Sequence, residues 1–595
     1  MIVPMKKLVV FVSSSARDSG LKKLRRLGVL HIKPTVAPVS EDLSQIEKQI
    51  ARTDKALEII GKDAGQPTGA FEATAAIKTV SEILDLSAER QKISGNLEIL
   101  NERRRWYDTW GKISQNDLAT LRKAGVHLRL YAIDKNQAKQ LPKDKLIQVV
   151  AQDKSRLYLA LIAESREEQI EFKEEIIPET DYDTTVHELE AAESRLNAIA
   201  ERHKALASER DNLTALRTEL EKRQRYASVR DGMGISEAVV YLEGYCPADS
   251  LPSVTELADK EGWGYLIDDP DDPEEVPTLI RKARWLKMID PVFNFMGTIP
   301  GYQEFDISLW FLAFFSLFFA ILVGDAGYGV LFLMLAIFFR RKYKNAPREP
   351  FWLVYVLSGA LIIWGSITGT WFGFETVARL PLFSSLVIEQ VATFSKDTAQ
   401  VTRFMMFFTF LIGAIHLSIG HILNGLKKIN SLQALAQVGW VGVVWGMFFL
   451  AGQLVLSKPM PGFALYILLG GAVIIACFDN YLKGHFWKGL GATIGNLPLS
   501  IISAFGDVVS YLRLFAVGMA GAVVEVSFNN MAIGEGVDNL LKGIIAVLII
   551  IFGHGLNIVL CMMSVIVHGI RLNMLEFSGH LGMQWTGQKY EPFRE

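Results

Sequence analysis

The stretch Ser510-Tyr-Leu-Arg-Leu-Phe-Ala-Val-Gly-Met-Ala-Gly521 places one arginine, Arg513, inside an apolar segment that runs from about Leu497 to Phe528. An arginine side chain stays charged in essentially any protein setting. At the centre of a bilayer it costs at least ~2.5–3.5 kcal/mol on insertion scales. Because a chain does not carry that cost without an offsetting partner, we expect Arg513 to face a carboxylate on another subunit.

The chain divides into two halves of different composition. Of its 595 residues, those up to about Trp285 are rich in Lys, Arg, Glu and Asp, whereas long apolar runs dominate from Phe293 onward. The mean hydropathy of +0.23 averages over both halves, and the net charge of −2 gives no indication of nucleic-acid binding. We therefore predict a cytoplasmic α+β half over 1–300, an α-helical membrane half over 301–580 and a cytoplasmic tail over 581–595.

Motifs for catalysis or cofactor binding are missing from the sequence. Cys246, Cys477 and Cys561 lie far apart and form no CxxC pair, so we expect neither a disulfide framework nor a zinc site. There is no phosphate-binding Gly-x-x-x-x-Gly-Lys-Ser/Thr loop and no HExxH. Gly324-Asp-Ala-Gly-Tyr-Gly329 lacks the preceding strand and the spacing of a dinucleotide loop. We expect no cofactor and no ATP hydrolysis by this chain alone.

Strand-like segments and heptad repeats alternate in the first half. Apolar residues spaced by three and four positions from Leu43 to Ile60 and from Leu189 to Leu213 predict long helices, with another ending near Trp110. A break at Gly65-Gln-Pro-Thr-Gly69 separates the first two. The predicted strands are 6–12, 29–32, 127–133, 156–162, 239–245 and 264–268. These elements predict two small α/β lobes joined by a long antiparallel coiled-coil arm.

Eight apolar segments predict eight transmembrane helices in the second half. They are 307–323, 326–340, 351–373, 404–423, 434–456, 463–478, 497–528 and 540–573. The last two are about ten residues longer than a perpendicular helix needs, so we expect them to tilt strongly. Loops assigned to the inner side carry nine Lys and Arg residues against five on the outer side, which predicts that both termini are cytoplasmic. The predicted location is the cell (inner) membrane, with multiple passes.

The eighth predicted helix carries a stripe of polar residues on one face, because its members are spaced three or four apart. The stripe consists of His554, Asn557, Cys561, Ser564, His568 and Arg571. Two interpretations stay open at this point, a water-lined ion path and plain polar packing between helices. Arg571 could also be an interfacial anchor, or it could lie deeper, near Arg513, if the helix is steeply tilted.

The seventh predicted helix places small residues on the face of Arg513, which permits close approach of another helix. That face holds Gly506, Ser510, Arg513, Val517 and Gly521. Glu525 lies about three turns toward the outer side, where it could line an outer half-channel or reach the outer headgroups. Asp507 lies toward the inner side and could help form an inner path. Our candidate ion-translocation site consists of Asp507, Ser510, Arg513, Glu525, His554, Asn557, Ser564, His568 and Arg571.

Several motifs resemble the membrane subunit a of rotary V/A-type ATPases, called subunit I in bacteria. Met5-Lys-Lys-Leu-Val-Val and Leu27-Gly-Val-Leu-His-Ile32 resemble the opening strands of that family. Tyr302-Gln-Glu-Phe-Asp306 resembles its approach to the membrane, although Ile307-Ser308 stands where the family usually has Pro-Thr. Gly324 to Gly329 resembles its first hairpin. The resemblance therefore runs the whole length of the chain.

The most specific match joins Ser510-Tyr-Leu-Arg-Leu514 with His568-Gly-Ile-Arg-Leu572. By this resemblance Arg513 is the essential arginine and Arg571 its companion on the last helix. Eukaryotic members often carry a histidine eight residues after the first arginine, where this chain has Gly521. A proton-carrying role at that position is therefore not expected here.

The resemblance implies partners and a mechanism. The soluble half would be a collar-like stator scaffold that holds peripheral-stalk E/G-type subunits and faces the central-stalk attachment subunit. The membrane half would pack against a rotating proteolipid ring, each subunit of which bears a carboxylate. Ions would enter one half-channel, neutralise a ring carboxylate, travel around in the lipid and leave by the other. The coupling ion, H+ or Na+, would be set mainly by the ring.

Two other classes of function were weighed. A secondary ion-coupled transporter would show internal repeats with paired broken helices near the midplane, and the eight segments show no convincing repeat. A purely structural membrane anchor would explain the coiled-coil arm but would leave Arg513 and the polar stripe without a role.

Overall fold

The computed structural model describes residues 1–61, 71–142, 144–480, 486–534, 536 and 539–595. The predicted break at 65–69 and Lys483 lie outside the described residues. The chain forms two compact units. The first comprises Met1–Val10, Leu27–His31 and Gly244–Arg594, and the second Phe11–Arg26 and Ile32–Glu243.

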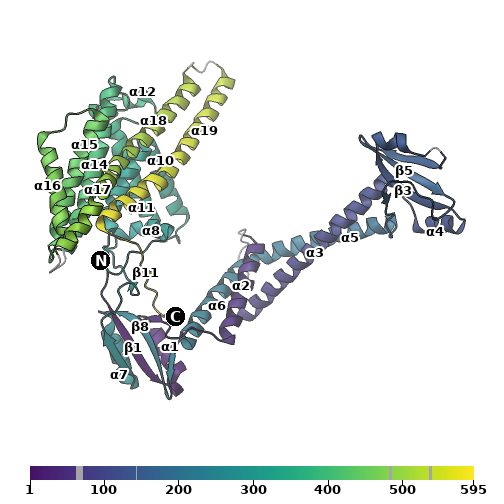
Figure 1. The fold of residues 1–595 in the computed structure, drawn as a ribbon, viewed down its shortest axis with the longest axis horizontal. Helices are drawn as coiled ribbons and strands as arrows, with labels where there is room; N and C mark the ends of the chain where they lie inside the picture. The colour runs from purple at the N-terminus through teal and green to yellow at the C-terminus, as the bar shows by residue number, and fades with distance from the viewer. Residues whose placement is uncertain (62–70, 143, 481–485, 535, 537–538) are drawn as a thin grey trace. The chain divides into compact units, whose positions relative to one another are not determined.

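Four long helices pack in pairs within the second unit. Helix α3 (Ala73–Trp110) lies along α5 (Tyr182–Leu206), and α2 (Glu41–Ile59) lies along α6 (Arg210–Asp231), as Figure 1 shows. Apolar side chains that include Ile83 and Leu213 are buried between them. Arg195 pairs with Glu89 at 2.7 Å across the α3–α5 contact. The segments that were expected to form a coiled-coil arm therefore form paired helices. Whether these helices supercoil stays a prediction.

The third predicted helix is interrupted, which corrects its continuous assignment. A short 3-10 turn, Ala207–Glu209, separates α5 from α6. Arg210 is the first residue of α6, and its side chain is only partly exposed. Its guanidinium donates to the carbonyl oxygens of Leu57, at 3.3 Å, and Gly61. Those carbonyls close the C-terminal end of α2, where a cation is favoured by the helix dipole.

Two sheets confirm the predicted strands and add others. One has the order β4-β5-β3-β6, formed by Ile147–Gln152, Arg156–Ala163, His127–Asp134 and Glu174–Glu175. The other has the order β2-β8-β1-β9, with β7 beside β8, formed by His31–Lys33, Val239–Pro247, Met5–Ser13, Gly264–Asp268 and Gly234–Ser236. Strand β4 was missed by the sequence interpretation. Three shorter helices accompany the sheets: α1 (Arg17–Leu27), α4 (Gln115–Lys123) and α7 (Leu251–Glu261).

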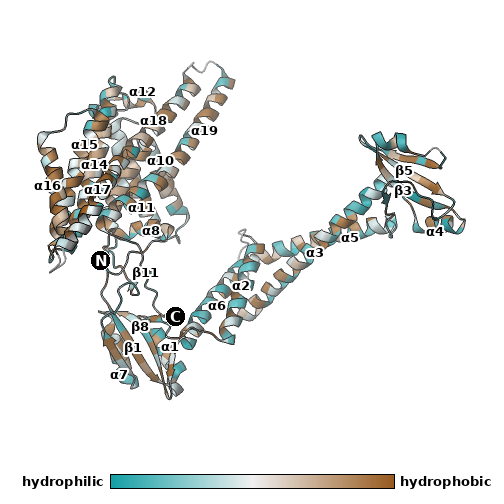
Figure 2. Ribbon diagram, viewed as in Figure 1, coloured by the Kyte–Doolittle hydropathy of each residue, from teal (hydrophilic) through white to brown (hydrophobic). Residues whose placement is uncertain are grey.

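Apolar helices dominate the rest of the first unit, and Figure 2 colours them brown for high hydropathy. They are α9 (Ser308–Val323), α10 (Ala326–Lys342), α11 (Glu349–Thr368), α14 (Thr398–Lys427), α15 (Gln433–Leu456), α16 (Gly462–Phe478), α17 (Phe486–Ser510), α18 (Leu512–Ile533) and α19 (Leu540–Ser564). Among the described residues, five helices are long and apolar enough to cross a membrane, and two shorter apolar helices are α9 and α16. The count of eight spans and the domain boundaries stay predictions.

The last two predicted spans depart from simple α-helices. The seventh predicted span is broken at Tyr511, between α17 and α18. The Tyr511 side chain is fully buried, and its hydroxyl lies 2.9 Å from Nδ1 of His416. The eighth predicted span continues past α19 as two π-helical segments, Val565–Gly569 and Leu572–Phe577, and ends in α20 (Ser578–Leu581). The apolar helical segments extend over 493–533 and 540–581, further than predicted.

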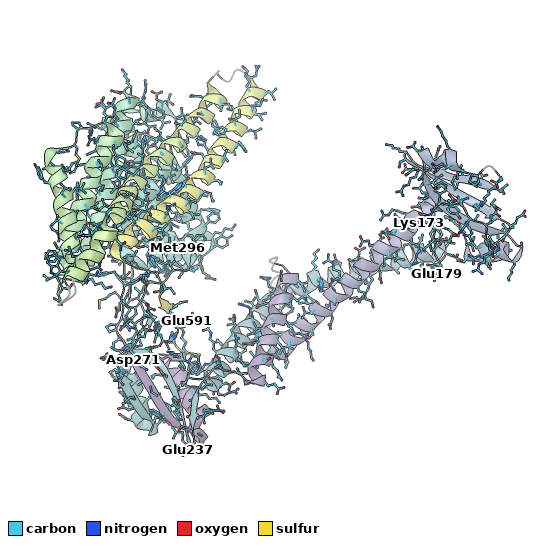
Figure 3. All side chains as sticks on the ribbon, in the orientation of Figure 1. Lys173, Glu179, Glu237, Asp271, Met296 and Glu591 are labelled. Atoms are coloured by element: carbon cyan, nitrogen blue, oxygen red, sulfur yellow. The ribbon has the colours of Figure 1, made fainter. Side chains whose placement is uncertain are left out.

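The C-terminal tail packs against N-terminal residues of the same unit. Strand β11 (Gln588–Lys589) pairs in parallel with β10 (Pro277–Thr278). Beyond it, the amide of Glu591, labelled in Figure 3, donates to Nδ1 of His31 at 3.1 Å. The amide of Phe593 donates to the carbonyl of Leu30 at 2.8 Å. The tail is therefore part of the folded unit.

Candidate functional site

Arg513 meets a carboxylate that its own chain provides. Its Nη2 lies 3.1 Å from Oε1 of Glu576, and its Nε donates to the carbonyl of Ser510 at 3.2 Å. Arg571 approaches the same oxygen, with Nε at 3.6 Å. The Glu576 side chain is only 4% exposed, against 29% for Arg513 and 52% for Arg571. Glu576 therefore offsets the charge of Arg513 within this chain, while the expected carboxylate on another subunit stays a prediction.

The π-helical geometry of the last segment explains this arrangement. A π-helix bonds each residue to the fifth one along, instead of the fourth. Arg571 and Glu576 are five positions apart, at the edge of the second π-helical segment. Their side chains therefore come to the same face, which a regular α-helical period would not give. π-Helical turns are rare and occur frequently at functional sites.

A polar pocket of about 520 Å³ lies on the inner side of this ion-pair cluster, by the predicted orientation. Asp507, Arg571 and Glu576 line it together with His421 and His580. Nε2 of His580 lies 3.0 Å from Oδ2 of Asp507, and its Nδ1 lies 2.8 Å from Nε2 of His421. His421 in turn contacts Oε1 of Gln437 through Nδ1, at 2.8 Å. We call this pocket and these residues the inner cluster.

A second set of polar residues, the outer cluster, surrounds Glu525, whose side chain is 1% exposed. The amide of Asn557 donates to Oε1 of Glu525 at 2.8 Å and approaches the hydroxyl of Tyr328 at 3.4 Å. That hydroxyl lies 2.6 Å from Nδ1 of His554, and Nε2 of His554 lies 3.0 Å from Oδ1 of Asn529. The chain of hydrogen bonds runs from Glu525 to Asn529 without interruption.

The outer cluster is anchored by the hairpin between α9 and α10. Asp325 caps α10 by accepting from the amide of Tyr328 at 3.0 Å, and its other oxygen accepts from the amide of Gly373 at 3.2 Å. The side-chain amide of Asn529 donates to the backbone carbonyl of Phe372 at 2.7 Å. Within the described residues, Oε2 of Glu525 is buried without a hydrogen-bond partner. That oxygen is free to accept a proton or a water.

The predicted polar stripe is divided between different surroundings. His554 and Asn557 belong to the outer cluster, and Cys561 contacts Asn557 at 3.8 Å. Ser564 bonds back to the carbonyl of Leu560 at 2.8 Å, so its own helix satisfies the hydroxyl. Nδ1 of His568 is buried and has no partner among the described residues.

The small-residue face of the seventh predicted helix is similarly divided. A Cβ at Gly506 would meet nothing within 4 Å, so that position is open. A Cβ at Gly521 would lie 3.3 Å from Sγ of Cys561. Gly518, which was not singled out, packs most closely, because a Cβ there would lie 2.4 Å from the carbonyl oxygen of Ile321.

Sequence reasoning missed several members of both clusters. His421, Gln437 and His580 are polar residues in or beside apolar segments, and that isolation is a signal that could have found them. Asp325 and Tyr328 lie in the glycine-rich hairpin, which was excluded as a nucleotide loop and compared with a family hairpin but was not assigned to the ion-translocation site. Within the described part of the chain, no group of three or more His, Cys, Asp or Glu side chains is placed to hold a metal ion.

Comparisons with known proteins identify the family. No family model matches the chain. V-type ATP synthase subunit I of Borreliella burgdorferi is 30% identical over 618 residues, and subunit I 1 of Treponema pallidum is 30% identical over 640, each match covering 100% of both chains. A-type ATP synthase subunit I of Methanocaldococcus jannaschii is 26% identical, over 68% of this chain and 62% of that protein.

A solved structure also matches, the cytoplasmic N-terminal domain of a subunit I described as a homolog of subunit a of V-ATPase. It covers 44% of this chain and 99% of that one, with 16% identity and a TM-score of 0.25, too low to establish a shared fold. The assignment to a family rests on the two sequence matches that cover the whole of both chains. This chain belongs to the V-type ATP synthase subunit I family, a family of membrane subunits of rotary ATPases.

Proposed function

We propose that this chain is the ion-translocating stator subunit of a rotary V/A-type ATPase, with Arg513 separating an inner from an outer half-channel. The observation that carries the proposal is the placement of the two polar clusters. Along the chain the inner cluster includes Asp507, before Arg513, and the outer cluster includes Glu525, after it. Twelve α-helical residues separate Arg513 from Glu525, which is roughly 18 Å of helix.

In this proposal Arg513 acts on the carboxylates of a proteolipid ring. An ion arriving through one cluster neutralises a ring carboxylate, which then rotates through the lipid. A ring carboxylate that reaches the guanidinium is held in its ionised form, because an opposite charge within a few Å favours that form. The bound ion is released into the other cluster, and Arg513 prevents direct leakage between the two.

Glu576 gives Arg513 a partner whenever no ring carboxylate is adjacent. An unpaired guanidinium at membrane depth is costly, and Glu576 lies 3.1 Å from it. The guanidinium therefore has two alternative partners, Glu576 and the ring carboxylate. Arg571 lies close enough to Glu576, at 3.6 Å, to neutralise it when Arg513 turns to the ring.

The cytoplasmic half serves as the mount in this proposal, with both termini on the cytoplasmic side of the cell membrane. The paired helices and the two sheets would hold peripheral-stalk E/G-type subunits and face the central-stalk attachment subunit. Long helix pairs joined by ion pairs such as Arg202–Glu82, at 2.6 Å, suit a part that resists torque. Moving one charge across 100 mV exchanges about 2.3 kcal/mol, so several ions must be coupled to each ATP.

The decisive experiment replaces Arg513 with lysine in the assembled complex. We expect Arg513→Lys to leave assembly intact but abolish ion transport coupled to ATP turnover, because lysine lacks the planar fork of donors. The matched control is Arg403→Lys, an exposed arginine in α14 outside both clusters. Normal coupled pumping by Arg513→Lys would refute the proposal, and would return a purely structural anchor to consideration.

A further inference from the structure

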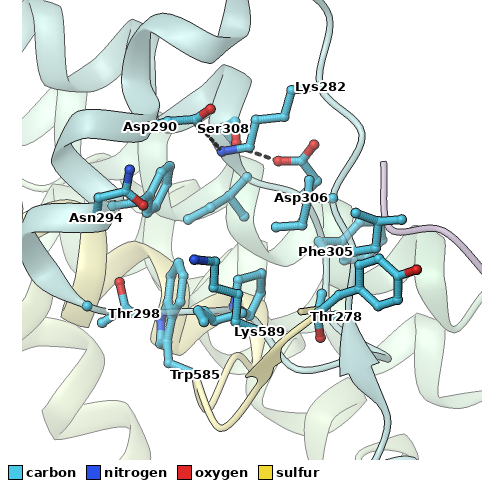
Figure 4. Close-up of a pocket in the computed structure, with 18 of the residues that line it drawn as sticks. Thr278, Lys282, Asp290, Asn294, Thr298, Phe305, Asp306, Ser308, Trp585 and Lys589 are labelled. Atoms are coloured by element: carbon cyan, nitrogen blue, oxygen red, sulfur yellow. Dashed lines mark hydrogen bonds and ion pairs between the residues drawn. The ribbon is translucent and has the colours of Figure 1, made fainter. Parts of the chain in front are cut away.

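A cavity of about 450 Å³ lies outside both clusters, where the chain approaches the first apolar helix. Figure 4 shows Lys282, Lys589 and Thr298 around it. Its walls come from α8 (Asp290–Met296), from the segment before α9 and from the C-terminal tail. Phe293, Phe305, Ile307, Trp585 and Tyr590 form its apolar part. All of these elements belong to the first unit.

Among the described residues, two threonines that line this cavity have buried hydroxyl groups without a hydrogen-bond partner. Oγ1 of Thr278 and Oγ1 of Thr298 are buried and make no hydrogen bond among the described residues. Leaving a buried polar group unsatisfied costs about 1–3 kcal/mol. Both threonines line the same cavity. A ligand with oxygen acceptors would satisfy them together.

The charges around the cavity favour an anion. Lys282, Lys287 and Lys589 line it together with two aspartates. Each aspartate already has a cation: Asp290 pairs with Lys282 at 2.6 Å, and Asp306 with the N-terminal ammonium of Met1 at 2.7 Å.

Lys589 is only weakly engaged, and Lys287 has an exposed side chain. Lys589 contacts Glu591 at 3.5 Å, with both side chains more than half exposed, and such surface pairs contribute little. The two lysines can therefore turn toward a negatively charged ligand.

The surroundings of the cavity point to the membrane surface. Trp285 and Phe295, which flank the Lys287 segment, are 53% and 71% exposed. Tryptophan is enriched at the level of the lipid headgroups. Lysines beside the cytoplasmic end of a membrane helix attract anionic headgroups. A phosphate at this level would sit between the lysines and the free hydroxyls.

We propose that this cavity binds a phosphate ester, with Lys287 and Lys589 contacting the anionic oxygens and Thr278 and Thr298 donating to them. The ester could be the headgroup of an anionic lipid or a free phosphate compound, since both present the same chemistry. The exposed aromatic residues favour the lipid source.

The test measures thermal stabilisation of the full chain in detergent, because a ligand that binds the folded state raises its melting temperature. The added probes are short-chain phosphatidylglycerol, phosphatidylcholine and inorganic phosphate. We expect phosphatidylglycerol to stabilise the chain and phosphatidylcholine not to. Stabilisation by inorganic phosphate alone would retain the site but assign it to a free phosphate compound. Stabilisation by neither anion would overturn the proposal.

Variants locate the binding. Lys287→Gln with Lys589→Gln is expected to weaken the apparent affinity at least tenfold, and Thr298→Val, which keeps all charges, severalfold. Arg284→Gln is the matched control, because Arg284 lies in the same segment, is exposed and does not line the cavity. An equal loss in Arg284→Gln would show general charge attraction and would overturn the site.

Discussion

The inner and outer clusters contain similar residue types but differ in exposure and in charge. In the inner cluster, the Asp507 side chain is 30% exposed and Arg571 is 52% exposed, around a pocket of about 520 Å³. In the outer cluster, Glu525 is 1% exposed and accepts a hydrogen bond from the side-chain amide of Asn557, and Tyr328 and His554 extend the hydrogen-bond chain. In the open inner pocket, water can take the place of a side-chain group that a substitution removes. In the buried hydrogen-bond chain of the outer cluster, water cannot enter to replace a removed group.

The largest effect is expected from the sealed cluster. Glu525→Gln keeps the shape and the contact with Asn557 but removes the buried carboxylate at which the hydrogen-bond chain begins. We expect coupled ion transport to fall by about 100-fold, the lower range of losses for a positioned proton-transfer group. Asp507→Asn, its counterpart in the open pocket, should lose about tenfold or less, since water reaches the site. ATP-driven ion uptake into proteoliposomes measures both, and equal losses would contradict the difference in sealing.

Glu576→Gln tests the shared carboxylate between the two arginines. Removing its charge leaves Arg513 and Arg571 close together without a counter-ion. We expect the chain to lose about 1–3 kcal/mol of stability, limited because both arginines are partly exposed. The melting temperature of the purified chain measures this. The double variant Glu576→Gln with Arg571→Gln should recover part of the loss, and no recovery would contradict a shared ion pair.

His568→Ala addresses the unpaired histidine between the clusters. Because Nδ1 of His568 is buried without a partner in the described chain, removing the imidazole breaks no hydrogen bond at this atom. We expect reduced ion flux with the complex still assembled. Unchanged flux would assign this position to packing alone.

Two glycines of the seventh predicted helix make a matched pair for packing. Gly518→Ala would force a methyl group against the carbonyl of Ile321, so we expect a destabilisation of about 1–3 kcal/mol. Gly506→Ala meets nothing within 4 Å, and alanine favours a helix, so the isolated chain should be unchanged or more stable by up to about 1 kcal/mol. Thermal unfolding compares them, and a similar loss in both would show that close packing is not the cause.

The smallest effect concerns His31 and the C-terminal tail. Burial lowers the pKa of His31 below its ordinary value of 6.5, while the nearby Glu591 opposes the shift. The unfolded chain therefore binds more protons than the folded one in this range. Stability from this contact is complete above pH 6.5 and is lost as pH falls through the lower folded pKa. The protection factor of the Glu591 amide in hydrogen exchange should fall over that window, and His31→Gln should remove this pH dependence.

The sequence pattern predicted most elements because they are long and strongly periodic. The strand at 6–12, the helix from Leu43 and the apolar segments were found, since burial requires regular spacing of apolar residues. The strand at 147–152 was missed because the consecutive residues Val149 and Val150 are both exposed, at an irregularity in the strand pairing, so apolar and polar residues do not alternate. Tyr511 interrupts a helix through a buried contact with His416, which lies 95 positions earlier, beyond any local signal.

The sequence predicted the charged residues at the centre of the candidate site, but it did not predict the residues that contact and position them. Arg513, Asp507 and Glu525 are costly in apolar segments, so their presence alone marked them. Glu576 was missed because the eighth segment was predicted to end at 573, whereas the helix continues through a π-helical segment that brings Glu576 to Arg571. Tyr328 and Asn529 reach the site only through tertiary packing of α10 and α18 against α19.

The pairing of β10 with β11 also has a consequence for biosynthesis. The two strands are separated by roughly three hundred residues that include every apolar helix, and translation proceeds at about 5–20 residues per second. Pro277 and Thr278 must therefore wait tens of seconds for their partner strand, until the membrane helices have been made. Closure of this strand pair would then report that the preceding helices have been synthesised, before partner subunits bind.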